Sequence, residues 1–329
     1  MASRHTFALV LVLAVAAAGC GGGSGEDSEP AVKVDSAAAA PASVFPAVRA
    51  ADDGIEQTLA DVEAGGPELA PSVSELRPGS NRVGFGLFDE DGTMPREAQV
   101  ALYTANADGT KPRGPFPARR ESLAVGAAFR SEQTANDATP YVYVASVPFT
   151  KAGGYGLVAV VRRAGKLVAS APVPVTVGKA GSGPPEVGDK APKIETLTPD
   201  DVGGDISKLT TRKPPLRSLV DTNVADVLGH KPVVIAFATP QLCQTRVCGP
   251  VVDLVAQLQS QFGDRAAFVQ QEVYKDDKPA RGLRPQLETY RLKTEPWTFV
   301  IDRSGVISAR YEGAFSAAEL EASVRAVAP

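Results

Sequence analysis

The stretch VVIAFATPQLCQTRVC, residues 233–248, decides the fold of the C-terminal half of this chain. Its first six residues are all apolar, which is typical of a strand buried on both faces of a parallel sheet. A Thr-Pro pair follows, and then Cys243 and Cys248. Residues 251–262 carry apolar side chains at helical spacing, and Gly263 is placed to end a helix. The stretch therefore predicts a strand-to-helix junction that holds two nearby cysteines.

The residues after this junction continue the alternation of strands and helices. The sequence predicts a strand from Ala267, a helix over 285–292 and a hairpin formed by 297–301 and 306–311. Ser316, followed three residues later by a glutamate, is a capping box that opens a last helix. The predicted order is β-α-β-α-β-β-α, an α/β fold.

The residues from 82 to 177 have the alternating pattern of half-buried strands. The expected strands, separated by turns rich in Gly, Asp and Asn, are 82–88, 98–103, 141–147, 155–162 and 167–177. Several short alternating strands at regular spacing predict a β-sandwich. The pattern resembles the immunoglobulin-like (Ig-like) domains of exported bacterial proteins, a likeness that concerns the fold class alone.

The N-terminus has the pattern of an export signal. The apolar run over residues 7–18 is shorter than the roughly 20 residues that span a bilayer, and it has the length of a signal peptide. It ends in Ala17-Ala18-Gly19-Cys20, which resembles the bacterial lipobox. The resemblance implies that Cys20 carries the lipid, and two acyl chains anchor a protein stably. We therefore expect an extracytoplasmic protein that is lipid-anchored to the bacterial cell membrane.

The C-terminal order, with a cysteine at the first strand-to-helix junction, resembles the thioredoxin-like fold. VGDKAP at 187–192 resembles the entry segment of exported thioredoxin-like reductases and peroxiredoxins. TEPWTFVID at 294–302 resembles the segment that carries a cis-proline in that fold, at Pro296. The resemblance implies that Glu295 and Pro296 lie against the cysteine pair and bind the substrate.

The composition and the linkers complete the expected organisation. The chain has 329 residues, 43% of them hydrophobic, and a net charge of −4, so it has no basic field that would recruit nucleic acid. We expect a signal peptide over 1–20, a flexible linker over 21–45, an Ig-like β-sandwich over 46–178, a linker over 179–186 and a thioredoxin-like domain over 187–329.

The two cysteines suggest thiol chemistry. The unpaired N–H groups at the start of a helix favour a thiolate, which is the nucleophile. We expect Cys243 to lie where the helix begins and to attack, with Cys248 as its resolving partner. Residues five apart in a regular helix exceed the Cα separation of about 4.4–6.8 Å that a disulfide tolerates. The pair can bridge only if Cys243 precedes the helix or if the first turn opens.

The chain departs in several ways from the families that it resembles. The thioredoxin motif is C-x-x-C, whereas here four residues separate the cysteines, and Ala236 stands where thioredoxins carry a buried acid. Some peroxiredoxins use the present spacing. Copper chaperones of the Sco type add a distant histidine, but the histidines here are His5 and His230. Glu272, at the end of a strand, is a further candidate to face the cysteines.

Three functions follow as hypotheses. The first is a thiol–disulfide oxidoreductase that acts on exported protein thiols and disulfides through Cys243 and Cys248, with no cofactor or metal. The second is peroxide reduction through a sulfenic acid on Cys243. The third is a non-catalytic binding lipoprotein in which the disulfide is a structural link. Nucleic acid is not an expected partner.

Overall fold

The computed structural model describes residues 35–48, 54–137, 139–243 and 245–329. The predicted signal peptide, Cys20 and most of the predicted linker over 21–45 lie outside the described residues. Within the described ranges, no helix has the length and apolar character needed to cross a membrane.

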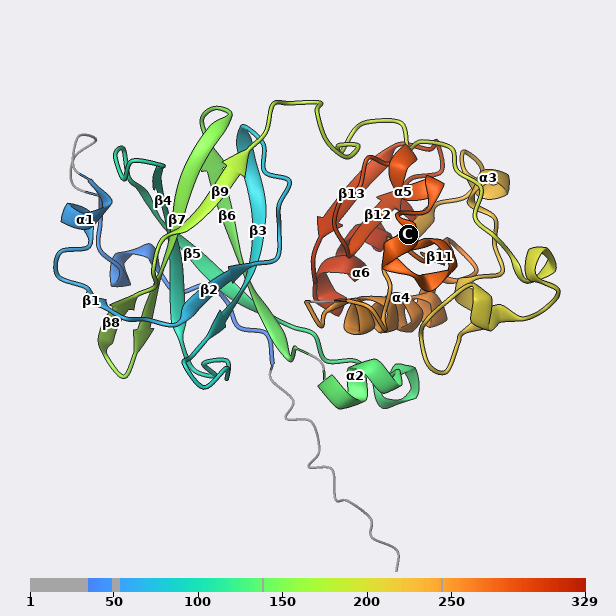
Figure 1. Ribbon diagram of the computed structural model, residues 1–329, viewed down its shortest axis with the longest axis horizontal. Coiled ribbons are helices and arrows are strands. Elements are labelled where there is room, and N and C mark those ends of the chain that lie inside the picture. Colours follow the sequence, from blue (N-terminus) through green and yellow to red (C-terminus); the bar gives the residue numbers. More distant parts are fainter. Residues whose placement is uncertain (1–34, 49–53, 138, 244) are drawn as a thin grey trace, which may run out of the picture. The chain divides into compact units, whose positions relative to one another are not determined.

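A four-stranded sheet in the C-terminal part is built around β10 (Val233–Phe237), with the strand order β11-β10-β12-β13. Figure 1 labels the other three strands of this sheet. β11 (Ala267–Gln271) pairs with β10 in parallel, and β12 (Trp297–Ile301) pairs antiparallel on its other side. β13 (Ile307–Glu312) forms the far edge. The sheet is therefore mixed: β10 has a parallel neighbour, as its apolar run predicted, and an antiparallel neighbour on the other side. All of β10 is buried, because helices cover both faces whatever the strand direction.

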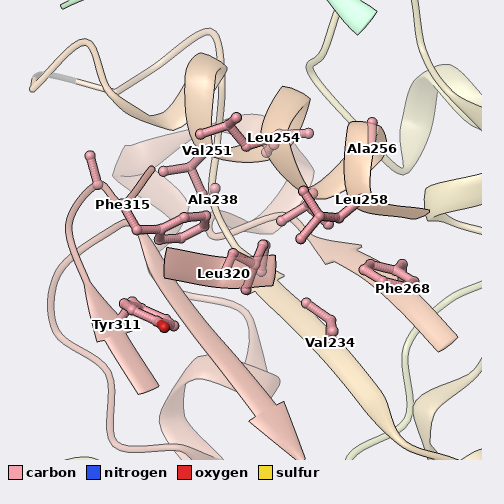
Figure 2. Close-up of a cluster of buried hydrophobic side chains, with 14 of the residues drawn as sticks. Val234, Ala238, Val251, Leu254, Ala256, Leu258, Phe268, Tyr311, Phe315 and Leu320 are labelled. Atoms are coloured by element: carbon pink, nitrogen blue, oxygen red, sulfur yellow. The ribbon is translucent and has the colours of Figure 1, made fainter. Parts of the chain in front are cut away.

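One face of this sheet packs against α4 (Cys248–Phe262) and α6 (Ala317–Val327). Figure 2 shows this core, in which Val234 and Ala238 from the β10 segment lie among side chains of the two helices. The apolar residues of α4 and α6 that the figure labels are Val251, Leu254, Ala256, Leu258 and Leu320.

The opposite face packs against α3 (Val224–Val227) and α5 (Pro285–Thr289). Val233, Ile235 and Phe237 of β10 belong to this second core. Because successive residues of a strand point to opposite faces, the continuous apolar run of β10 supplies both cores.

The element order β10, α4, β11, α5, β12, β13, α6 confirms the predicted β-α-β-α-β-β-α order. β12 has its predicted bounds, and α6 opens with the predicted capping box, in which the Glu319 N–H donates to Ser316 Oγ at 3.2 Å. The start of α4 differs, since the helix begins at Cys248. Gly263 follows the helix in a right-handed conformation (φ −58°).

The N-terminal part contains a short helix α1 (Ile55–Thr58) and strands that run in the order β1-β8-β7-β4-β5-β6-β3-β2, with β9 paired to β7. The strands are β1 (Glu63–Ala64), β2 (Glu68–Pro71), β3 (Gly79–Phe88), β4 (Gln99–Asn106), β5 (Arg113–Ser122), β6 (Tyr141–Phe149), β7 (Gly153–Arg163), β8 (Lys166–Ala169) and β9 (Val173–Val177).

Strand β5 joins two halves of this sheet. Its first part pairs with β4, where Ala118 lies opposite Val100, and its second part pairs with β6, where Arg119 lies opposite Val144. Side chains from both halves, such as Phe85 on β3 and Val100 on β4, share one buried core. Two faces around a common core are the arrangement of a β-sandwich; its immunoglobulin-like class stays a prediction.

Several of these strands differ from the sequence-based expectation, which did not include β1, β2 or β5. β5 was missed because Pro115, Pro117 and several charges obscure its alternation. The single strand expected over 167–177 is two strands, β8 and β9, which pair with successive parts of β7. The break falls at 170–172, and Pro172 has no N–H to continue a ladder.

A buried ion pair joins Asp253 on α4 to Arg212, and both residues are hydrogen-bonded to the connection between β5 and β6, which contains α2 (Glu132–Asp137). Asp253 on α4 accepts hydrogen bonds from Arg212 Nε at 2.8 Å and from the Ser131 N–H and Oγ at 2.7 and 2.8 Å. The side chains of Arg212 and Asp253 are 3% and 0% exposed. Since all polar partners are supplied internally, the charges are tolerated in the core.

Removing this carboxylate is expected to destabilise the protein strongly. Asp253→Ala leaves the Arg212 guanidinium buried without its counter-ion, which lowers the free energy of unfolding by about 3–5 kcal/mol. Glu321→Ala, which breaks the exposed helical pair with Arg325, is the control and should cost about 0.5 kcal/mol or less. Urea unfolding measures both, and equal losses in the two variants would contradict the role assigned to Asp253.

Candidate functional site

Cys243 and Cys248 form a disulfide at the junction of β10 and α4. Cys243 lies in the loop after β10, and Cys248 is the first residue of α4. The expectation that Cys243 begins the helix was wrong. Its position before the helix is one of the two arrangements that permit bridging, and the Cα atoms are 5.9 Å apart, within the range that a disulfide tolerates.

The two sulfur-bearing residues differ in their access to solvent. Cys243 is partly exposed, and its Sγ lies 3.3 Å from Thr245 Oγ1. Cys248 is 0% exposed and belongs to the core beneath α4. Gly249, the next residue, packs so closely against α2 that a Cβ there would come within 3.1 Å of Gln133 Cβ. An incoming molecule therefore meets Cys243 first.

Pro296 has the cis peptide bond that the sequence analysis assigned to it. The Glu295–Pro296 bond lies just before β12, and Trp297 at the start of that strand pairs with Phe237 at the end of β10. This register brings Glu295 to the loop that begins at Thr239. Pro296 itself is buried.

The Glu295 carboxylate points at the cysteine pair. Its Oε2 accepts a hydrogen bond from the Thr239 N–H at 2.6 Å and lies 3.7 Å from Cys248 Sγ. Burial, together with the neighbouring charge of Glu272, raises the pKa of Glu295 to about 7. The carboxyl group is thus placed to exchange a proton with the buried sulfur; the predicted contact with a substrate stays a prediction.

Glu272, which the sequence analysis named as a candidate, lies directly after β11 and is 0% exposed. Its Oε1 accepts from the Thr211 N–H at 2.6 Å, from Thr211 Oγ1 at 3.0 Å and from Gln270 Nε2 at 2.9 Å. Its Oε2 is buried without a hydrogen-bond partner in the described part of the chain. Burial raises the pKa of Glu272 to about 7.

Thr239 and Tyr274 complete the surroundings of the two carboxyl groups, and the sequence analysis missed both roles. The Thr239 side chain is fully buried, accepts from the Val273 N–H at 3.1 Å and lowers the pKa of both glutamates. Tyr274 faces Glu295, whose charge adds to burial in raising the pKa of the phenol. The Thr-Pro sequence after β10 was the only signal that marked this position.

The described residues contain no cluster of three His, Cys, Asp or Glu side chains that is arranged to hold a metal ion. His230, the histidine weighed for a copper site, is exposed in the turn before β10. At the junction, the disulfide lies beside the carboxyl group of the partly exposed Glu295, and the charge of the buried Glu272 acts on that carboxyl group.

Comparison with known proteins gives no family assignment, since no family model and no curated protein matches the chain. A solved structure of a candidate thiol:disulfide interchange protein DsbE from Chlorobium tepidum is 20% identical, with a TM-score of 0.30, and the match covers 44% of this chain and 99% of that one. The Lin-41 filamin domain is 13% identical, with a TM-score of 0.19, over 34% and 97% of the two chains. At these TM-scores neither likeness carries an argument.

The raised pKa of Glu272 gives the stability of the protein a pH dependence of definite sign. The folded protein keeps a proton that the unfolded chain releases between the ordinary pKa of 4.5 and the raised value of about 7. The free energy of unfolding therefore falls as pH rises through this interval and levels off above it. Glu272→Gln keeps a neutral side chain and should remove part of this fall, on the order of 2 kcal/mol.

Urea unfolding of the two proteins at a series of pH values measures this difference. Glu288→Gln, at an exposed position on α5, is the matched control and should keep the pH dependence of the parent protein. The same pH dependence in Glu272→Gln and in the parent would contradict the raised pKa of Glu272.

Proposed function

We propose that the chain is a thioredoxin-like thiol–disulfide oxidoreductase, lipid-anchored at Cys20 outside the cytoplasm, that acts on exported protein partners. The observation that carries the proposal is the Cys243–Cys248 disulfide at the first strand-to-helix junction, with the Glu295 carboxyl group 3.7 Å from Cys248 Sγ. The β-α-β-α-β-β-α order of the C-terminal part supports a thioredoxin-like domain over 187–329. The sandwich over 46–178 and the linker over 179–186 belong to the same proposal.

The proposed exchange runs through the accessible cysteine. A partner thiolate attacks Cys243 Sγ, the disulfide breaks, and Cys248 leaves with the electron pair of the broken bond. A second thiol of the partner then displaces Cys243 from the mixed disulfide. The partner has become a disulfide and the protein a dithiol, and the reverse sequence oxidises the protein. The difference in exposure between the two cysteines supports these roles.

A second candidate function is a non-catalytic lipoprotein in which the disulfide only links the loop to α4. The observation that favours it is the complete burial of Cys248 in the core, since structural cysteines of this kind are inert. The two candidates differ in whether either sulfur exchanges with an external thiol under native conditions.

Single-cysteine variants, made in a Cys20→Ser background so that no other thiol reacts, test the proposal. With glutathione disulfide, Cys248→Ser should form a stable mixed disulfide at Cys243, because the resolving thiol is missing. Cys243→Ser should react more slowly by about tenfold or more, because Cys248 is buried. Intact-protein mass spectrometry follows both reactions.

The parent protein should also accelerate the reduction of insulin by dithiothreitol. With either single-cysteine variant, the rate should equal that of dithiothreitol alone. A mixed disulfide on neither variant, together with no acceleration by the parent, would leave the structural disulfide as the better account. Faster trapping at Cys248 would reverse the assigned roles.

A further inference from the structure

The buried sulfur of the disulfide touches a carboxyl group that the proposed exchange has not yet used. Glu295 Oε2 lies 3.7 Å from Cys248 Sγ. A disulfide sulfur has no proton to donate, whereas a protonated carboxyl group is a donor and a thiol can in turn donate to a carboxylate. The contact is therefore favourable in both redox states. The carboxyl group holds the proton while the disulfide is intact, and the Cys248 thiol holds it after reduction.

A second carboxyl group faces the first across Thr239. Glu272 is 0% exposed, its Oε2 has no hydrogen-bond partner among the described residues, and its charge raises the pKa of Glu295. Two carboxyl groups in a shared buried site do not both ionise readily, because each charge opposes the other in a medium of low polarity. The pair is therefore suited to hold one proton at neutral pH.

The other titratable groups around the pair act in opposite directions. The hydrogen bond of Tyr274 lowers the pKa of Glu295, whereas the charge of Asp277 raises the pKa of Glu272, and in both glutamates burial is the largest effect and raises the pKa. Cys248 faces Glu295 from the first turn of α4, and Arg246 lies in the loop between the two cysteines. The ion pairs of the described residues include neither Glu272 nor Glu295. The neutral form is thus favoured by burial and by neighbouring negative charge.

The two glutamates differ in access to water. Glu295 is partly exposed, whereas Glu272 is sealed in the interior. Glu295 can therefore take up a proton from solvent and pass it inward to Cys248. In the described part of the chain, no hydrogen bond joins Glu272 to either sulfur. Glu272 therefore acts on the reaction only through its effect on Glu295, as a positioning residue.

We propose that Glu295 is the general acid and base for Cys248, and that Glu272 keeps Glu295 protonated while the disulfide is intact. This inference rests on the proposed exchange. When an external thiolate attacks Cys243 Sγ, the S–S bond breaks, and Cys248 Sγ keeps its electron pair and takes the proton of Glu295. Glu295 becomes a carboxylate and recovers a proton from solvent. In the oxidising direction Glu295 takes the proton of the Cys248 thiol, and the resulting thiolate attacks the mixed disulfide at Cys243.

The reduction of the disulfide by dithiothreitol tests this role without any physiological partner. The rate, divided by the concentration of dithiothreitol thiolate at each pH, should fall as pH rises through about 7, where Glu295 loses its proton. Glu295→Gln should lower the rate below that pH by about 10²-fold and remove the inflection.

Glu272→Gln should leave the inflection in place but move it to lower pH, because an uncharged neighbour no longer opposes ionisation of Glu295. A shift in the pH of the inflection would not result from a loss of stability alone. Glu288→Gln, exposed on α5, should reproduce the profile of the parent protein. If Glu295→Gln does not fold, the displacement in Glu272→Gln decides the question.

An unchanged inflection in Glu295→Gln, with a rate within about twofold of the parent, would overturn the inference. An inflection at the same pH in Glu272→Gln and in the parent would show that Glu272 does not influence the protonation of Glu295. Failure of the proposed function looks different: the parent would show the inflection with dithiothreitol and yet give no acceleration of insulin reduction. A disulfide that dithiothreitol does not reduce would contradict both.

Discussion

The antiparallel pairing of β10 with β12 is the constraint on which the site depends. Phe237 lies opposite Trp297 in this register, so the loop that leaves β10 faces the residues that enter β12. Thr239 and Glu295 meet at that point, with 2.6 Å between the backbone nitrogen and Oε2. A slip of one residue would turn every side chain of β12 to the opposite face. The packing of both cores therefore fixes the position of Glu295 against the cysteine pair.

The buried charges of the molecule fall into two kinds. Asp253 is fully buried but has Arg212 as its counter-ion and Ser131 as a further donor, which is the arrangement expected of a structural charge. Glu272 is equally buried, yet one of its carboxyl oxygens has no partner in the described part of the chain. Groups whose ionisation is perturbed by burial and by a like charge are more common at functional sites than elsewhere. This contrast favours the glutamate pair over the ion pair for the proposed proton transfer.

Much of the C-terminal fold could be predicted because its signals are local. The apolar run of β10, the Ser316–Glu319 capping box and the cis-proline at Pro296 each follow from short stretches of sequence. In the N-terminal part the prediction was weaker, since β5 pairs with two different strands and carries prolines. Alternation within a strand says nothing about a change of partner along its length.

Only part of the site could be predicted, because some of its residues are marked by local sequence and others are brought together by strand pairing. The two cysteines and Glu295 were identified from their positions along the chain, but the start of α4 was placed too early relative to Cys248. The role of Thr239 and the proximity of Glu272 to Glu295 depend on the order and register of β11, β10 and β12. Those contacts join residues far apart in the sequence, and the spacing of residues does not reveal them.

The reduction potential of the Cys243–Cys248 pair distinguishes a catalytic disulfide from a structural one. It is measured by equilibrating the purified protein with glutathione redox buffers and alkylating the free thiols. A potential above about −230 mV, in the range of catalytic dithiols, is the result that the account predicts. A potential below about −300 mV would mark a structural disulfide and would contradict the account.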